Sequence, residues 1–182
     1  EEFHSRDFTA RGGLMEMAQL WVNLPARDKL SAPRYQTVLD KDIPVVALPG
    51  EAGSLRVIAG DFADHAGPAK TFTPINVWDL RLKAGRSASL DIPEGHNAVL
   101  VVLNDTVRVN DTDDVPASRY VVFAQTGGGI TVEAQADALH VGEHLDQRHL
   151  HLLEQPLDPE LGEPPPLALG ELTREARIDR RV

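Results

Sequence analysis

The chain has 182 residues, an apolar fraction of 42% and a formal net charge of −10 at pH 7, and it contains no cysteine. This length suits one domain, or one and a part, and the apolar fraction is sufficient for a packed core. The acidic charge disfavours nucleic-acid binding, no apolar run is long enough to span a membrane, and the lack of cysteine excludes disulfides and thiolate metal ligands. We therefore expect a cytoplasmic protein with no nucleic-acid and no membrane partner.

The first clear element is a predicted β-strand at residues 19–25. Apolar and polar side chains alternate there with the period of two that is typical of a strand with one face on a core. Pro25 ends the strand because it cannot donate to a ladder. The polar face combines one aromatic ring with two amides, which suits a lined cavity. The core face consists of Leu20, Val22 and Leu24, and the pocket candidates are Gln19, Trp21 and Asn23.

Short apolar runs then follow one another at close spacing up to residue 141. Residues 78–83 alternate between apolar and charged, whereas residues 98–103 are continuously apolar, as expected for a strand covered on both faces. The glycine triplet at 127–129 indicates a turn. Seven short strands with no helix between them predict an all-β sandwich or barrel. The predicted strands are residues 55–59, 77–82, 98–103, 106–109, 120–124, 130–133 and 138–141.

The last part of the chain has a different composition. Four of the seven histidines, His140, His144, His149 and His151, lie close together, and five prolines follow between residues 156 and 166. The prolines predict an extended or partly disordered tail. Imidazoles at these spacings suit Zn, Fe, Cu or Ni, but they also suit an exposed histidine-rich junction without a resident metal. Both interpretations stay open at this point.

Several strings in the sequence resemble the pirin family, a group of proteins with two cupin domains. They are QLWVNLP at 19–25, PRYQ at 33–36, TFTP at 71–74 and PEGHNA at 93–98. The resemblance extends over residues 1–140. It implies a cupin barrel, the C-terminal domain of such a protein, at 51–141. Residues 1–50 would be a remnant of the N-terminal cupin domain with its linker, and residues 142–182 a divergent tail.

The resemblance also implies a metal site. Pirins bind iron, or another divalent transition metal, through three histidines and a glutamate. Glu2 matches that glutamate, while the three histidines have no counterpart in the chain, so we expect an N-terminally truncated protein that binds no metal by itself. His4 lies two residues from Glu2 and could form a makeshift site with it. Only His96 follows the PEG turn at 93–95, where metal-binding cupins carry a His-x-His.

Three functions are compatible with these expectations. The first is a pirin-like cupin protein that is catalytically silent because most of the metal site is absent. The second is the activity that the resemblance implies for the intact family, a metal-dependent quercetin 2,3-dioxygenase that opens a flavonol-like substrate. The third is a non-catalytic module that binds a protein partner, with its acidic charge favouring basic surfaces.

Overall fold

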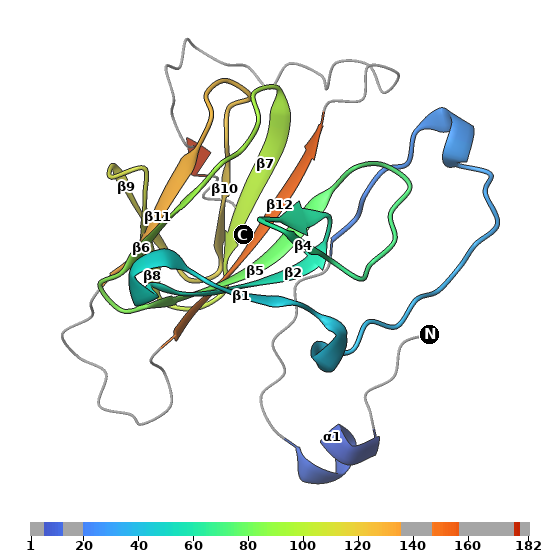
Figure 1. Ribbon diagram of the computed structural model, residues 1–182, viewed down its shortest axis with the longest axis horizontal. Helices are drawn as coiled ribbons and strands as arrows, with labels where there is room; N and C mark the ends of the chain where they lie inside the picture. Colours follow the sequence, from blue (N-terminus) through green and yellow to red (C-terminus); the bar gives the residue numbers. More distant parts are fainter. Residues whose placement is uncertain (1–5, 13–19, 136–146, 157–176, 179–182) are drawn as a thin grey trace.

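Two facing antiparallel β-sheets and a small hairpin form most of the structure (Figure 1). The computed structural model describes residues 6–12, 20–135, 147–156 and 177–178. The larger sheet has seven strands in the order β1-β2-β5-β12-β7-β10-β13, and the smaller has four in the order β6-β11-β8-β9. Together we call these two sheets the barrel. Among the described residues, no helix has the length and apolar character needed to cross a bilayer.

The strands of the larger sheet are β1 (Val45–Ala47), β2 (Gly53–Ala59), β5 (Asn76–Lys83), β7 (His96–Val102), β10 (Arg119–Val122), β12 (Gln147–Pro156) and β13 (Arg177–Ile178). Those of the smaller sheet are β6 (Ser87–Leu90), β8 (Thr106–Val109), β9 (Asp113–Pro116) and β11 (Ile130–Ala134). The hairpin pairs β3 (Asp61–Phe62) with β4 (His65–Ala66). The short helices are α1 (Arg6–Arg11), η1 (Ala26–Asp28), η2 (Asp40–Asp42) and η3 (Pro49–Glu51).

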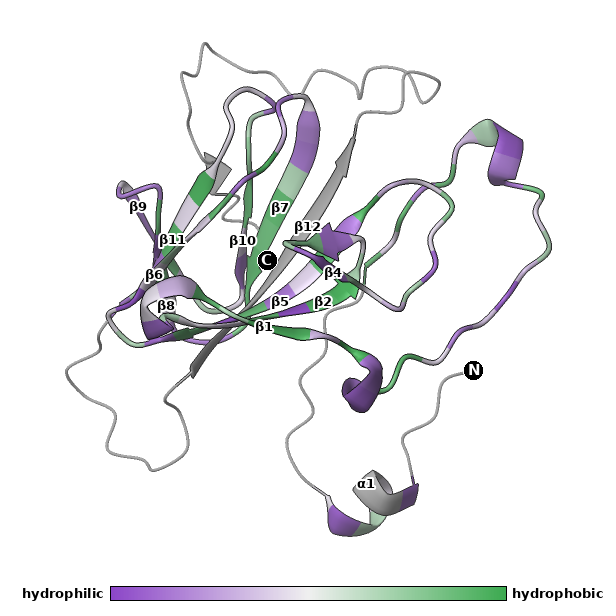
Figure 2. Ribbon diagram, in the orientation of Figure 1, coloured by the Kyte–Doolittle hydropathy of each residue, from purple (hydrophilic) through white to green (hydrophobic). Residues whose placement is uncertain are grey.

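The core lies between the two sheets and follows from the alternation of side chains along each strand. In β2, β7 and β11 every second residue is buried, as the period of two requires. Burying one such Leu or Val side chain contributes about 1.5–3 kcal/mol relative to leaving it in water. Hydropathy colouring shows green, hydrophobic stretches along β2 and β7, with a purple, hydrophilic start of β7 (Figure 2). The largest side chains without exposed surface are Leu55, Leu80, Leu82, Leu90, Leu100, Val57, Val102, Val107 and Val109.

The all-β prediction is confirmed, and six predicted strands correspond to β2, β5, β7, β8, β10 and β11. The seventh, residues 138–141, lies outside the described residues. Sequence analysis missed β1, β6 and β9: β1 has three residues, and β6 and β9 have small or acidic side chains at most of their positions, so they lack a clear apolar pattern. The glycine triplet at 127–129 connects β10 to β11, as predicted.

The turn at Asn104 and Asp105 differs from the hairpin turns found elsewhere in the fold. Asp105 has a φ of 61°, a conformation that Asp tolerates better than most residues. The strands on either side, β7 and β8, belong to different sheets and do not pair. This turn therefore carries the chain from one sheet to the other.

Two further expectations differ from the structure. Residues 98–103 are buried on one face but half-buried on the other, rather than covered on both. Residues 147–156, which sequence analysis places in a Pro-rich tail, form β12 between β5 and β7. The prolines that predict an extended tail begin at Pro156, the last residue of this strand, where a missing N–H costs little, and the other four lie outside the described residues.

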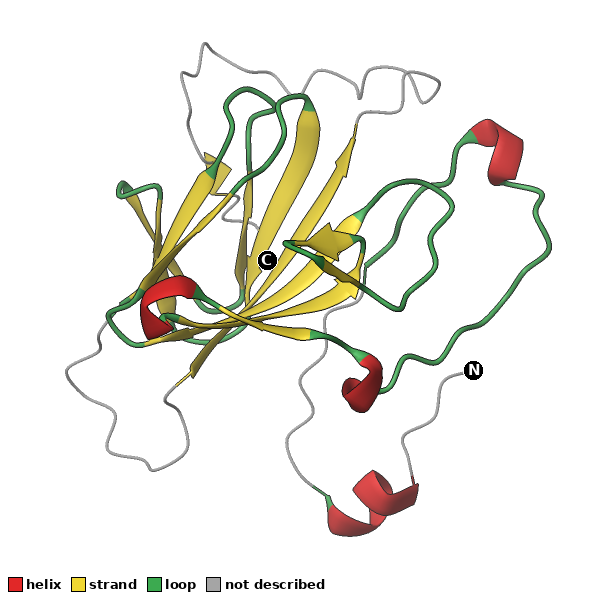
Figure 3. Cartoon of the chain, in the orientation of Figure 1, coloured by secondary structure: helices red, strands yellow, loops and turns green. Residues whose placement is uncertain are grey.

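The segment from residue 20 to residue 39, which we call the arm, runs outside the barrel. It holds only the 3₁₀ turn η1 and otherwise has no regular secondary structure (Figure 3). The predicted strand at 19–25 is therefore wrong over its described part, residues 20–25. None of the described strands pairs with these residues. Without hydrogen bonds to a neighbouring strand, alternating side chains alone do not hold a segment in the strand conformation.

Candidate functional site

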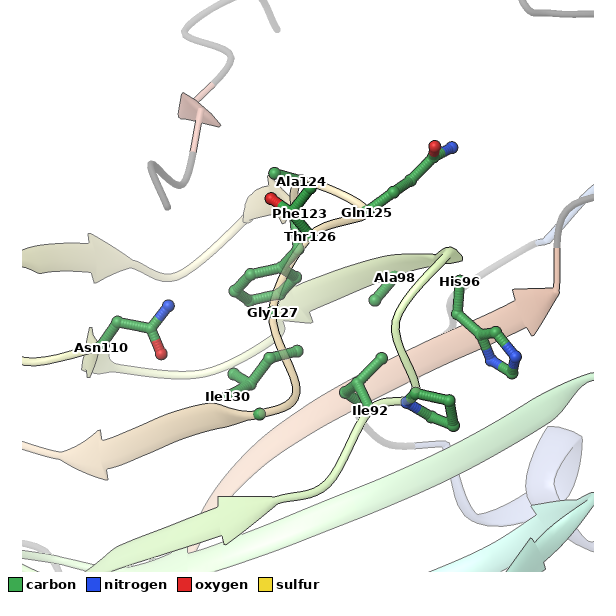
Figure 4. Close-up of a pocket in the computed structure, with 12 residues that line it drawn as sticks. Ile92, His96, Ala98, Asn110, Phe123, Ala124, Gln125, Thr126, Gly127 and Ile130 are labelled. Atoms are coloured by element: carbon green, nitrogen blue, oxygen red, sulfur yellow. The ribbon is translucent and has the colours of Figure 1, made fainter. Parts of the chain in front are cut away.

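A small pocket opens at one end of the barrel (Figure 4). Its walls come from the loop after β6, the start of β7, the residue after β8 and the loop between β10 and β11. Its volume is about 50 Å³. The residues that line it are Ile92, Pro93, His96, Ala98, Asn110, Phe123, Ala124, Gln125, Thr126, Gly127, Gly129 and Ile130.

Hydrogen bonds fix the shape of the pocket. The backbone N–H of Gly95 donates to the carbonyl oxygen of Gln125 at 2.7 Å, and the Gln125 side chain donates to Asn97 Oδ1 at 2.8 Å, so two loops are tied together at the rim. On the opposite wall, Asn110 Oδ1 accepts the backbone N–H of Thr131 at 2.9 Å. The floor is apolar. Such a pocket is preorganised, and the side chains of Asn110 and Gln125 take part in holding its walls together.

His96 is the one imidazole of the pocket. It begins β7, its side chain is half-buried, and its ring points away from that of Phe123 (Figure 4). Transition-metal sites in proteins combine several imidazole, carboxylate or thiolate ligands. The pocket has no carboxylate in its lining, and within the described ranges no three His, Asp or Glu side chains lie close enough to hold a metal ion. The described residues therefore do not fit the iron site that the family resemblance implies.

Most of the predicted metal ligands lie outside the described residues. These are Glu2, His4, His140 and His144.

His149 and His151 lie on a strand, β12, in the part of the chain that sequence analysis assigned to a divergent tail. Their backbones pair with Arg81 and Asp79 of β5, respectively. Metal binding stays a prediction for all six candidate ligands, the four residues outside the described ranges and the two histidines of β12.

The pocket candidates of the arm lie elsewhere. Trp21 is 91% exposed, Asn23 is also exposed, and neither lines the pocket. Gln19 is outside the described residues. Because residues 20–25 have no neighbouring strand in the described sheets, nothing forms a cavity wall opposite Trp21 and Asn23. Their assignment to a substrate pocket stays a prediction.

Sequence analysis missed a buried charge cluster on the outer face of the larger sheet. Asp79 is 3% exposed and accepts hydrogen bonds from Arg56 at 2.8 Å and from Arg81 at 3.1 and 3.2 Å. Arg56 also contacts Asp40 of η2. Two guanidinium groups offset the cost of burying the carboxylate, so the alternating charges of residues 79–83 do not mark a solvated face. The one sequence feature that could have indicated this cluster is Arg81, which lies two residues from Asp79 on the same face of the strand.

An exposed ion pair joins β8 to β9. Arg108 donates two hydrogen bonds to Asp114, at 2.9 and 3.2 Å. The hydrogen bond from Arg108 lowers the pKa of the Asp114 carboxyl below its usual value, and the same bond raises the pKa of Arg108. The pair lies in water, so it orients a hairpin and does not form a reactive centre.

Comparison with known families gives a match to the Pirin C-terminal cupin domain over residues 77–148. The chain belongs to the pirin family. The match covers the barrel from β5 onward and ends within β12. The all-β cupin fold expected for the pirin resemblance is confirmed.

Relatives and solved structures agree with this assignment. A Pseudomonas aeruginosa protein named "Putative quercetin 2,3-dioxygenase" is 47% identical over 150 residues, which are 81% of this chain and 52% of that protein. A Caulobacter vibrioides pirin-like protein is 39% identical over 131 residues, covering 69% of this chain and 45% of its own length. The chain thus spans about half the length of the curated pirin relatives it matches.

The solved structure of quercetin 2,3-dioxygenase from Acinetobacter baumannii superposes with a TM-score of 0.75 and 39% identity, covering 85% of this chain and 50% of that one.

Proposed function

We propose that this chain acts as a metal-free cupin domain of the pirin type and oxidises no flavonol by itself. The observation that carries the proposal is the pocket at the barrel end. Its volume of about 50 Å³ is far below the ~300–1,000 Å³ of sites that enclose a small organic ligand. Its polar lining offers one imidazole, His96, and no carboxylate. A flavonol does not fit there, and a first-row metal would lack ligands.

The alternative is a quercetin 2,3-dioxygenase-type oxidoreductase with iron or another divalent metal and a flavonol-like substrate. The names of the Pseudomonas relative and of the Acinetobacter structure favour it. In this chain the metal would need ligands beyond the pocket, from Glu2, His4 and the histidines between residues 140 and 151. A bound metal would supply activation of the chelated substrate and of O₂.

One experiment separates the two functions. The purified untagged chain is analysed for iron, nickel, copper and zinc, and O₂ uptake is recorded after quercetin is added, with the Acinetobacter enzyme as the positive control. We expect far less than one metal per chain and no quercetin-dependent O₂ uptake. Stoichiometric metal would contradict the proposal. Glu2→Gln and the pair His149→Ala/His151→Ala would then identify the ligands by loss of that metal.

A binding role for a protein partner and a cytoplasmic location remain predictions from composition. The negative charge favours a partner with a basic surface, because complementary charge raises the rate of association.

A further inference from the structure

The pocket at the end of the barrel matches one branched aliphatic side chain in size and character. Its floor is apolar and includes the buried side chains of Ile92, Ala98 and Ile130 (Figure 4). A volume of about 50 Å³ holds roughly four water molecules. The side chains of Leu and Ile have the same number of carbon atoms. The cavity that encloses a benzene ring in a protein core measures about 150 Å³, so an aromatic side chain is too large for this pocket.

The loops that form the walls of the pocket carry negative charge only. These loops contain three carboxylates and neither Lys nor Arg. Each carboxylate is exposed and belongs to a residue next to one that lines the pocket, so the two Cα atoms are about 3.8 Å apart. The rim of the pocket therefore favours a positively charged partner. The loops are residues 91–95, 110–112 and 123–129, and the carboxylates are those of Asp91, Glu94 and Asp111.

The opposite end of the barrel lacks this charge. Successive strands cross the barrel from one end to the other, so the loops 84–86, 103–105 and 117–118 lie away from the pocket. They contain one basic residue, Arg86, and one acidic residue, Asp105, a net charge of 0. The loops at the pocket have a net charge of −3, from three acidic and no basic residues. Exposed charges act over about 8 Å in physiological salt, so a bound partner meets this local charge rather than the charge of the whole chain.

The walls of the pocket are held in place by the barrel itself. Gln125 is hydrogen-bonded to Gly95 and Asn97 across the rim. On the opposite wall, Asn110 accepts the backbone N–H of Thr131. A site of fixed shape loses little entropy when a ligand enters it. All lining residues lie between 92 and 130, inside the match to the C-terminal cupin domain, so the site includes no residue of the arm.

We propose that the pocket end of the barrel binds a basic segment of a partner protein and encloses one Leu, Ile or Val side chain of that segment. The aliphatic side chain fills the apolar floor, and Lys or Arg residues on either side of it face Glu94 and Asp111. A buried anchor surrounded by polar contacts is the usual arrangement of a protein interface. This inference goes beyond the proposed function, because it names a surface and the chemistry of its partner and does not depend on metal content.

The test is a titration of the full chain with the capped pentapeptide Lys-Lys-Leu-Lys-Lys, followed by NMR through the methyl signals of Ile92 and Ile130. We expect both signals to shift and to saturate. Replacing Leu by Ala in the peptide should raise the Kd about 30-fold, because three carbon atoms leave the floor. Replacing Leu by Phe should also weaken binding, because the ring is too large for the pocket. The acidic peptide Glu-Glu-Leu-Glu-Glu should not bind, because its charge has the same sign as that of the rim.

Substitutions in the chain test the charge of the rim. Glu94→Gln/Asp111→Asn removes two carboxylates and should raise the Kd of the basic peptide about 5-fold at low salt, with no difference left at about 1 M salt. The matched control is Glu51→Gln/Asp105→Asn, which makes the same chemical changes at the opposite end of the barrel. Asp105 and Asp111 have φ values of 61° and 59°, a conformation that Asn also tolerates. The control should leave the Kd unchanged.

Four outcomes would overturn the proposal. One is the absence of saturable shifts at Ile92 and Ile130. Another is equal affinity for the peptides with Leu, Ala and Phe. The third is binding of the acidic peptide as tightly as of the basic one, and the fourth is a control variant that weakens binding as much as the rim variant does. Circular dichroism confirms that each variant is folded. No readout depends on metal content or O₂ uptake, so failure here and failure of the proposed function are distinguishable.

Discussion

Leucine has opposite surroundings in the barrel and in the arm. Leu80 in β5 has no exposed surface, whereas Leu30 in the arm is 98% exposed. In the barrel, each strand places alternate residues on a face that another sheet covers. In the arm, Leu20, Val22 and Leu30 are exposed, and none of the described strands pairs with this segment. The difference teaches that an apolar pattern predicts a buried face only where the fold supplies a second layer.

The largest effect should come from truncating matched leucines in the two regions. Leu80→Ala leaves a cavity in the core and should lower the free energy of unfolding by about 3 kcal/mol. Leu30→Ala should change it by less than about 0.5 kcal/mol, because no packing is lost. Urea unfolding at low protein concentration measures both. Equal losses would show that the arm packs on the barrel in solution and would break the comparison.

The second prediction compares carboxylates. Asp79→Ala removes the partner of Arg56 and Arg81 at a buried position and should cost about 3 kcal/mol of unfolding free energy. Asp28→Ala in the arm removes a surface ion pair with Arg27 and should cost less than about 0.5 kcal/mol. Thermal unfolding of the two variants tests the contrast. A small loss for Asp79→Ala would mean that water replaces the carboxylate without penalty.

The third prediction concerns the anchor of the arm. Gln36→Ala removes both hydrogen bonds to Lys70 and should cost about 1 kcal/mol locally, with little change in global unfolding. The expected readout is faster tryptic cleavage at Lys29 and Arg34 and faster amide exchange at Lys70. Gln36→Glu, which keeps the acceptor but loses the donor, should give an intermediate rate. Unchanged cleavage would show that Gln36 does not hold the arm.

The smallest effect is a pH dependence in the barrel. Arg108 holds the pKa of Asp114 below its ordinary value, so the ionised carboxylate favours the folded state. That contribution is complete above the unfolded pKa of about 4 and is lost as the pH falls through the lower folded pKa. Asp114→Asn should therefore be slightly less stable than the wild type near neutral pH and equal to it in strong acid. A difference that persists in acid would contradict this assignment.

Sequence patterns predicted those strands and turns that are specified by residues close together in the chain. The six predicted strands and the glycine turn at 127–129 follow from periodicity and turn chemistry. The pirin resemblance supplied the cupin fold. The missed features depend on residues far away in the sequence. Asp79 can be buried because Arg56 of β2 donates a hydrogen bond to it. Strand β12 lies in the middle of the larger sheet because it pairs with both β5 and β7.

The candidate site was less predictable for the same reason. Its walls come from four separate segments between residues 92 and 130, and no motif links them. His96 was singled out by the family pattern, while Asn110 and Phe123 carried no signal. Trp21 and Asn23 were expected to line a cavity; neither lines the pocket at the end of the barrel, because the residues that lie opposite a segment cannot be read from the sequence of that segment.

The central place of β12 has a consequence for how the protein is made. Until residues 147–156 leave the ribosome, β5 and β7 cannot be bridged, and the larger sheet exists as two separate halves with unpaired inner edges. Such edges pair readily with other chains. Contacts between residues this far apart in the sequence also form slowly, because a long loop must close first. The nascent chain therefore passes through an aggregation-prone interval that ends only when its last long strand is inserted.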